Sequence, residues 1–405
     1  DIDLSEDGNT LWVVNLEARS LVRLNVANGA QPTSLTSFSL ASASGTPTCT
    51  NGVLRPWALK LTNGKGYLGV VCTGENATGT PTQTRSSLSA HVLSFNPATT
   101  GGTMAFTQEL NITDMTFNRG LVWNAAGLNY DGAFQWNYWD STLDASKMCR
   151  FGPPRLSTYP TPILGDIEFD NNGDMILGFI DRTSMQLAGS NYGINGDTDF
   201  FRNFSGGDIL KACQSNGTFQ LENNGMCGGV AGSGVGNGEG PGGGEFFGQE
   251  TTPLTGASVH AKVGKYGLAL LRGLTTSDVV SVMMDPVTYT SGGLGWFSTT
   301  DGEKSKAYEV YAQVWPGSTG KASGLGDVEL FCPILPLELG NHIWLDINND
   351  GCQDPDEVGI DGIAVNQYKN WVLVGQTTTA NGGHYLFNDS NVTLNGASGI
   401  LPKRK

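Results

Sequence analysis

A strand, a tight turn and a second strand recur along much of the chain, and this cadence constrains the fold more than any other feature. The first copy runs from Asp3 to Val14, the second from Trp57 to Val71, and the third from Gly165 to Phe179. Apolar side chains that alternate on either side of an Asn-Gly or Asp-Gly turn are typical of β-hairpins. The chain is therefore expected to consist of many short antiparallel strands.

The spacing of these copies predicts a repeating unit. Leu4 and Leu59 are 55 positions apart, and Leu59 and Ile167 are 108 apart, nearly twice that distance. A separate outer strand follows each hairpin: Ser20–Val26, Ser89–Pro97 and Gly207–Ala212. This period is a little above the usual span of a four-stranded propeller blade, so the repeat favours a β-propeller. Later segments keep the strand pattern, and the last of them, Gly326–Phe331, is expected to close the ring against the first.

The composition agrees with an all-β chain. With 57 Gly, 17 Pro and 15% charged residues among 405, the chain is poor in helix formers and rich in turn formers. At 405 residues the chain is long enough for two or three domains with real cores, and its hydrophobic fraction of 39% is ordinary for a soluble protein. The Gly-rich stretch Gly228–Gly248 predicts a long loop, and the Pro-punctuated stretch Cys332–Leu339 predicts a stiff linker.

The order of hairpin, turn and outer strand resembles the surface-layer β-propellers related to the YVTN family. This resemblance implies a β-propeller of about seven blades over residues 1–331.

A calcium loop is predicted near the end of the chain. Residues Asp346–Glu357 match every term of the pattern D-x-[DN]-x-[DN]-G-x5-E, with Gly351 at the sharp turn. The predicted ligands all offer oxygen, Cys352 through its backbone carbonyl, and they are Asp346, Asn348, Asp350, Cys352, Asp354 and Glu357. The alternative is a solvated acidic turn, but its crowded carboxylates would repel one another without a counter-ion. The pattern therefore favours a bound cation.

The flanks of this loop predict strands, whereas an EF-hand needs two helices. Together with the loop, the blocks Gly340–Asp346, Gly359–Val365 and Thr379–Phe387 resemble the SdrD B-like domain, a Cna-B-type immunoglobulin-like β-sandwich of bacterial surface proteins. The resemblance implies a linker at 332–339 and a small sandwich at 340–405. The family's last strand has no clear counterpart, which predicts either truncation or an open edge that takes a strand from a neighbour.

The net charge of −15 and the pI near 4.6 disfavour nucleic acid as a partner. No run of about 18 apolar residues is present, so no membrane span is predicted. No signal peptide precedes Asp1, and the numbering is expected to begin after processing.

Cysteines and glycosylation signals favour an oxidising, extracellular compartment. The chain has seven Cys and carries N-x-[ST] sites at Asn76, Asn111, Asn203, Asn216, Asn388 and Asn391. Cys49 with Cys72 and Cys213 with Cys227 are candidate local disulfides, although spacing alone does not prove pairing. A third pair, Cys332 with Cys352, would leave Cys149 over.

Signals for catalysis are sparse, because the chain has no H-E-x-x-H, P-loop or C-x-x-C motif. The four scattered histidines are interpreted as packing or surface residues: His91, His260, His342 and His384. One polar cluster remains a candidate for propeller chemistry: Asp166, Glu168, Asp181 and Arg182. The segment Phe134–Asp140 favours core packing over a carbohydrate platform. The acidic segment Asp170–Asp174 favours a turn over a second metal site, because Met175 stands where the loop glycine should be.

These features predict a non-enzymatic extracellular structural protein of a cell surface. It would be a subunit of a filament, tube or surface layer, or an adhesin, rigidified by calcium. The predicted partners are further copies of itself or other surface proteins, with glycans as additional candidates. The alternative is a propeller enzyme or carbohydrate-binding adhesin in which the sandwich serves as a spacer.

Overall fold

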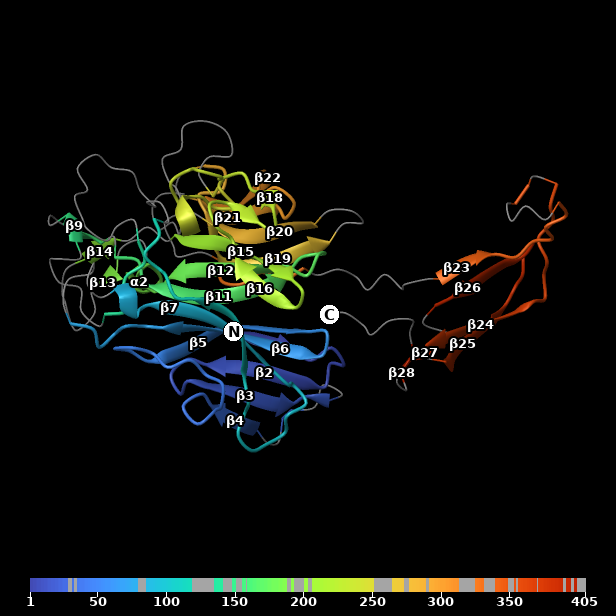
Figure 1. The fold of residues 1–405 in the computed structure, drawn as a ribbon, viewed down its shortest axis with the longest axis horizontal. Helices are drawn as coiled ribbons and strands as arrows, with labels where there is room; N and C mark the ends of the chain where they lie inside the picture. Colours follow the sequence, from blue (N-terminus) through green and yellow to red (C-terminus); the bar gives the residue numbers. More distant parts are fainter. Residues whose placement is uncertain are drawn as a thin grey trace. The chain divides into compact units, whose positions relative to one another are not determined.

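A computed structural model shows the chain as two compact units (Figure 1). The first comprises Asp1–Ser5 and Thr10–Leu330, and the second comprises Glu6–Asn9 and Phe331–Lys405. The structure describes residues 1–27, 31–32, 35–78, 85–118, 135–140, 148–150, 155–157, 159–187, 191–192, 200–202, 206–250, 264–272, 277–288, 291–312, 325–330, 339–348, 353–354, 356–369, 371–388, 391–394 and 397–398.

The first unit is dominated by four antiparallel sheets of four strands each. Within each sheet the strands lie side by side in the order in which they occur along the chain. The first sheet contains β1 (Ile2–Leu4), β2 (Thr10–Asn15), β3 (Ser20–Asn25) and β4 (Leu35–Ser39). The second contains β5 (Leu54–Thr62), β6 (Lys65–Cys72), β7 (Ser89–Phe95) and β8 (Thr107–Ile112). The third contains β11 (Pro162–Phe169), β12 (Met175–Asp181), β15 (Gly207–Ser215) and β16 (Thr218–Leu221). The fourth contains β19 (Gly264–Arg272), β20 (Ser277–Met284), β21 (Ser291–Ser298) and β22 (Lys304–Ala312).

The predicted hairpins are confirmed, and the turn of the second one has the expected backbone. Between β5 and β6, Asn63 and Gly64 both have positive φ angles, 52° and 73°. A two-residue turn with two positive φ angles matches the twist of antiparallel strands, and Asn-Gly adopts it at little cost. The sequence therefore sets the local register of this hairpin, in which Thr62 pairs with Lys65.

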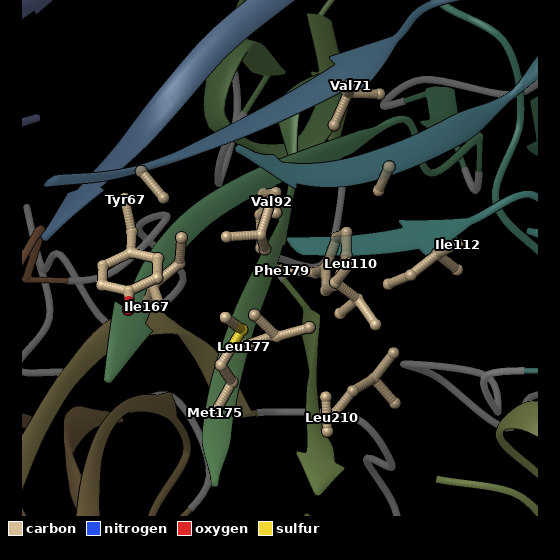
Figure 2. Packing of buried hydrophobic residues seen from close by; sticks show 14 of the residues in the cluster. Tyr67, Val71, Val92, Leu110, Ile112, Ile167, Met175, Leu177, Phe179 and Leu210 are labelled. Carbon is tan, nitrogen blue, oxygen red and sulfur yellow. The ribbon is translucent and has the colours of Figure 1, made fainter. Parts of the chain in front are cut away.

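Successive sheets pack face to face through apolar side chains. Trp12 of the first sheet packs against Phe95 of the second, with ring centroids 5.1 Å apart. Figure 2 shows the next interface, where Val92 of β7 lies in one cluster with Leu177 of β12 and Leu210 of β15. A third cluster joins the third and fourth sheets. The second and third sheets are therefore covered on both faces, which explains their nearly continuous apolar strands.

Carboxylates connect the first strands of the sheets. Asp1 accepts a hydrogen bond through Oδ2 from the backbone N–H of Leu59, at 2.7 Å, and Asp3 does the same for Leu61. Asp166 of β11 accepts from the backbone N–H of Leu268 in β19, also at 2.7 Å. These bonds satisfy backbone donors that would otherwise lie unpaired along the first strands.

The all-β expectation is confirmed, but no sheet among the described residues closes into a ring. The propeller of about seven blades therefore stays a prediction. The predicted strand Gly326–Phe331 is wrong for its described part, because residues 325–330 join no sheet. One reason is local: the N–H of Val328 donates to the Asp327 side chain, at 2.8 Å, rather than to a neighbouring strand.

Smaller elements fill the remaining described parts of the first unit. They are a four-stranded sheet of β9 (Met148–Arg150), β10 (Arg155–Ser157), β13 (Asn191–Tyr192) and β14 (Phe200–Arg202), the hairpin β17 (Met226–Cys227) and β18 (Val230–Ala231), the helix α2 (Arg182–Leu187), and the single turns η2 (Arg85–Ser87) and η5 (Pro241–Gly243). The Gly-rich stretch is mostly loop, as predicted, but it contains β18 and η5, and it is anchored because Phe246 and Phe247 are fully buried.

The second unit consists of two-stranded antiparallel pairs. They are β23 (Leu339–His342) with β26 (His384–Phe387), β24 (Ala364–Lys369) with β25 (Val372–Thr378), and β27 (Thr393–Leu394) with β28 (Ala397–Ser398). Phe387 and Val392 are buried at its centre, and Val392 forms a bridge with Gly375 of β25. The predicted strands around the predicted calcium loop are thus present. The predicted linker lies almost wholly outside the described residues, and the domain bounds and the missing last strand stay predictions.

Both candidate local disulfides are confirmed, Cys49–Cys72 and Cys213–Cys227. Cys332 and Cys352 lie outside the described residues, so their pairing stays a prediction. Within the part of the chain that the structure describes, no helix has the length and apolar character needed to cross a membrane.

Candidate metal centre

The predicted calcium loop begins and ends on backbone segments that are joined by hydrogen bonds. Leu345 donates its N–H to the carbonyl of Val358, at 3.0 Å, and Trp344 forms an antiparallel bridge with Gly359. Beyond the bridge, Ile360 donates to the carbonyl of Ile343. The loop is therefore a closed excursion between two paired strand ends, which is why residues at its two ends can meet.

Among the described residues of the loop, Glu357, the predicted bidentate ligand, is the buried one, with 7% of its surface exposed. Its Oε1 accepts from the N–H of Ile347, at 2.7 Å, and its Oε2 accepts from the N–H of Asp354, at 3.1 Å. These two bonds hold the carboxylate plane toward the start and middle of the loop. Each oxygen retains lone-pair capacity for a cation, because a carboxylate oxygen can accept more than one partner.

Two further predicted ligands lie close together. Asn348 donates from Nδ2 to Oδ2 of Asp354, at 2.8 Å, and Oδ1 of Asp346 is shielded from solvent. The structure describes four of the six predicted ligands, whereas Asp350 and Cys352 lie outside the described residues. A donor set of carboxylate and amide oxygens fits calcium, a hard cation that prefers oxygen.

The two described histidines of the second unit form a structural stack beside this loop. The rings of His342 and His384 are 4.5 Å apart, and His342 Nδ1 lies 3.0 Å from Oε1 of Gln353. The other ring nitrogen of His342 contacts the carbonyl of Gly382. His342 therefore positions the loop, which agrees with the packing interpretation.

The structure separates the predicted polar cluster into two places. Glu168 pairs with Lys60 across the second and third sheets, and Asp166 faces the fourth. Asp181 instead accepts from the N–H groups of Thr161 and Thr183, and the guanidinium of Arg182 lies 4.7 Å from the ring centroid of Trp139. The four side chains therefore do not form one site.

The turn interpretation of Asp170–Asp174 is confirmed. Oδ1 of Asp170 accepts from the N–H groups of Asn172 and Asp174. The sequence did not indicate the partner of these carboxylates, Lys211 of β15, whose Nζ lies 3.0 Å from Asp170 and 3.2 Å from Asp174. Only the pairing of β12 with β15 brings this amine to the turn.

A second set of acidic residues was also missed. Asp208, Glu245 and Glu250 are buried, and each offers an oxygen within 4.8 Å of the other two. Burial, followed by the charge of Asp208, raises the pKa of Glu250 well above its usual value. No motif in the sequence links the three residues, because Asp208 lies in β15 whereas Glu245 and Glu250 flank the turn at residues 246–249.

The remaining candidates are core residues. Trp136 and Trp139 are 0% and 5% exposed, so the aromatic segment packs in the interior and offers no open platform at these two rings. His91 is buried beside Ser89, and burial lowers its pKa to about 4. The structure does not describe His260.

The geometry defines an all-β protein of two units whose second unit carries an acidic loop between strand ends. The SdrD B-like domain family matches residues 337–393 of this unit. Across 50 residues, or 12% of the chain, the sequence is 48% identical to serine-aspartate repeat-containing protein F of Staphylococcus epidermidis, 3% of whose length is covered.

Two relatives align with both units. The chain is 28% identical over 392 residues to Colossin-A of Dictyostelium discoideum, and 26% identical over 391 residues to Colossin-C. These alignments cover 93% and 91% of the chain but 3% and 33% of the relatives. The chain thus spans a third or less of these proteins. Their names are not those of enzymes, which is compatible with the expectation of a non-enzyme.

Proposed function

We propose that this chain is an extracellular structural or adhesive protein of a cell surface whose second unit is rigidified by calcium. Its similarity to an SdrD B-like domain and to serine-aspartate repeat proteins supports the surface role. The two disulfides support an oxidising compartment. The observation that carries the proposal is the buried carboxylate of Glu357, held by two backbone N–H groups inside the acidic loop.

Calcium would act as a clamp in this loop. Asp346, Asn348, Asp354 and Glu357 would hold the ion with Asp350 and the Cys352 carbonyl, and its charge would offset the repulsion between the carboxylates. Because the loop joins two paired strand ends, an ion there would stiffen the end of the second unit. A clamp of this kind suits a spacer or stalk that must resist deformation.

The first unit would serve as the larger structural head. The four face-to-face sheets are proposed to be blades of a propeller-type ring, and the whole chain is proposed to assemble with itself or with other surface proteins into a filament, tube or layer. Among its described residues, the strands of the second unit form two-stranded pairs, and assembly by strand addition at their edges would fit this arrangement.

Calcium binding is tested on the full chain after chelator treatment. We expect heat on titration with calcium and a rise in the melting temperature of the second unit, and we expect Glu357→Gln to lose both. Asp356→Asn is the matched control, because Asp356 is an exposed loop residue outside the predicted ligand set. Absence of heat and of stabilisation in the wild type would exclude calcium.

Light scattering of the same samples tests assembly. We expect particles larger than one chain with calcium and smaller particles after chelation. A strictly monomeric chain at every calcium concentration would contradict self-assembly while leaving the calcium site intact.

A further inference from the structure

One N-x-[ST] site of the first unit lies on an outer strand. Asn111 belongs to β8, the last strand of the second sheet, and is exposed. Its neighbours Leu110 and Ile112 are buried in the apolar cluster (Figure 2). Because successive side chains of a strand point to opposite faces, Asn111 points away from this core. The strand itself therefore presents the acceptor sequence Asn111-Ile112-Thr113 to solvent.

The amide of Asn111 is available for modification, unlike that of another candidate. Among the described residues, no hydrogen bond engages the side chain of Asn111. In Asn391, by contrast, Oδ1 accepts from the N–H of Asn388, at 2.8 Å, and Nδ2 donates to the carbonyl of Leu386, at 2.9 Å. A sugar on Asn391 would crowd this donor next to the buried side chain of Val392. A sugar on Asn111 would displace no hydrogen bond within the described chain.

A cavity of about 210 Å³, here named the β8 cavity, lies beside Asn111. Its lining combines polar and apolar residues and includes Asn111, Thr113, Asp114, Phe117, Leu221 and Pro241. Pockets that hold drug-sized ligands measure roughly 300–1,000 Å³. The β8 cavity is smaller and therefore suits a single sugar ring.

The walls of the β8 cavity are fixed by contacts within the chain. Phe117 packs against the apolar cluster of the second and third sheets. Asp114 accepts through Oδ1 from the N–H of Thr116, at 2.8 Å. The N–H of Gly240 donates to the carbonyl of Asn118, at 2.6 Å, which ties the Gly-rich loop to the segment after β8. Because the cavity is already formed, little ordering is needed when it is filled.

The lining matches the chemistry of a sugar ring, which carries C–H groups on its faces and hydroxyl groups around its rim. Phe117 and Leu221 supply apolar surface for the C–H groups. Asp114 can accept hydroxyl donors in addition to its bond with Thr116, because a carboxylate oxygen takes more than one partner. Since Asn111 itself lines the cavity, a sugar bonded to Nδ2 would start at its rim.

We propose that Asn111 is an N-glycosylation site and that the first sugar of its glycan packs in the β8 cavity. The donor is an oligosaccharide joined through C1 to a lipid diphosphate. Transfer breaks the bond between C1 and the diphosphate oxygen and forms a bond between C1 and Nδ2 of Asn111, which loses one proton, and the lipid diphosphate leaves. The proposal rests on the extracellular location proposed above, because such acceptor sites are used in secreted proteins.

Site occupancy in the full chain from its native source tests the modification. Peptide N-glycosidase in heavy-oxygen water converts each glycosylated Asn into labelled Asp, which peptide mass spectrometry locates. We expect label at Asn111 and none at Asn391. Label at Asn76 or Asn216 with Asn111 unlabelled would overturn this site but leave secretion intact, and label at no site would overturn both. Calcium titration of the same sample tests the calcium clamp independently.

Calorimetry tests the packing of the first sugar. An endoglycosidase that leaves the first sugar on Asn111 should preserve the first-unit transition, whereas complete removal should lower its melting temperature by about 2 °C or more. Phe117→Ala removes the aromatic wall, so complete removal should not lower the transition of this variant further. Equal melting temperatures of the trimmed and the fully deglycosylated wild type would overturn the packing.

Two substitutions at Thr113 separate the glycan from the change of side chain. Thr113→Ala removes the acceptor sequence and should lower the transition as complete deglycosylation does, whereas Thr113→Ser keeps the sequence and should match the wild type. Asn76→Gln is the matched control, because it removes an exposed acceptor that does not line the β8 cavity, and it should leave the transition unchanged. Far-ultraviolet circular dichroism confirms that each variant is folded.

Discussion

At the scale of single residues, the first unit depends on a buried lysine. The side chain of Lys211 is 4% exposed, and its Nζ contacts Asp170, Asp174 and the carbonyl of Thr299, the last at 2.7 Å. The ring of Phe246 covers the amine, with its centroid 4.7 Å away. A buried charge with this many partners joins the Asp170 turn to the fourth sheet.

Lys211→Met tests this role. The variant keeps most of the side-chain volume but leaves the buried carboxylate of Asp170 without its cation, so we expect a loss of about 3–5 kcal/mol in the free energy of unfolding. Lys65→Met is the control, because the Lys65–Glu109 pair leaves 57% of the lysine side chain exposed and should contribute about 0–1 kcal/mol. Urea unfolding followed by tryptophan fluorescence measures both. Equal effects would show that burial of the pair is unimportant.

At the scale of elements, the sheets approach closely enough to exclude side chains. A Cβ at Gly178 of β12 would lie 2.6 Å from the carbonyl oxygen of Tyr266 and 2.8 Å from its Cα, both backbone atoms of β19. The third and fourth sheets therefore meet nearly backbone to backbone at this point. No flexible side chain is available there to move aside.

Gly178→Ala should therefore force the two sheets apart. We expect a loss of about 1–3 kcal/mol in the free energy of unfolding, as for other overpacked interiors. Gly101→Ala provides the comparison, since its Cβ would have no atom within 4 Å. Chemical denaturation of both variants measures the free energy of unfolding. A Gly178→Ala protein as stable as the wild type would contradict this packing.

At the scale of the whole molecule, the two units are stabilised by different means. The first contains both described disulfides and the large apolar clusters. The second has a small centre around Phe387 and Val392 and would depend on its acidic loop. Small domains usually need such supports, because their cores bury too little apolar surface.

Calorimetry of the full chain should therefore resolve two transitions. Replacing Cys49 and Cys72 together with Ala should lower the first-unit transition, with a cost of about 2–4 kcal/mol, and leave the calcium-dependent transition in place. Chelation should lower only the second transition. A single transition that responds to both changes would show that the units unfold together.

Local features of the fold could be predicted because they depend on neighbours in the chain. Asn63-Gly64 specifies its turn through backbone sterics, and the alternating strands around it follow from the same hairpin. The acidic loop could be predicted for a similar reason, because its predicted ligands lie within twelve consecutive positions. This short spacing lets Glu357 return to accept a hydrogen bond from the N–H of Ile347. Cys213 and Cys227 lie 14 residues apart, at opposite ends of a short excursion.

Contacts between distant segments needed the tertiary structure. The pairing of Lys211 with Asp170, the packing of Tyr266 on Gly178, and the hydrogen bond from the N–H of Leu268 to Asp166 each join segments that no local pattern relates. Which sheet faces pack together depends on the burial of apolar side chains. Because the hydrophobic effect is non-directional, the sequence pattern of one strand does not specify which other face will cover it. Periodicity therefore determined the strands and the loop of this protein, whereas only the packing of sheet upon sheet decided which charges are buried together.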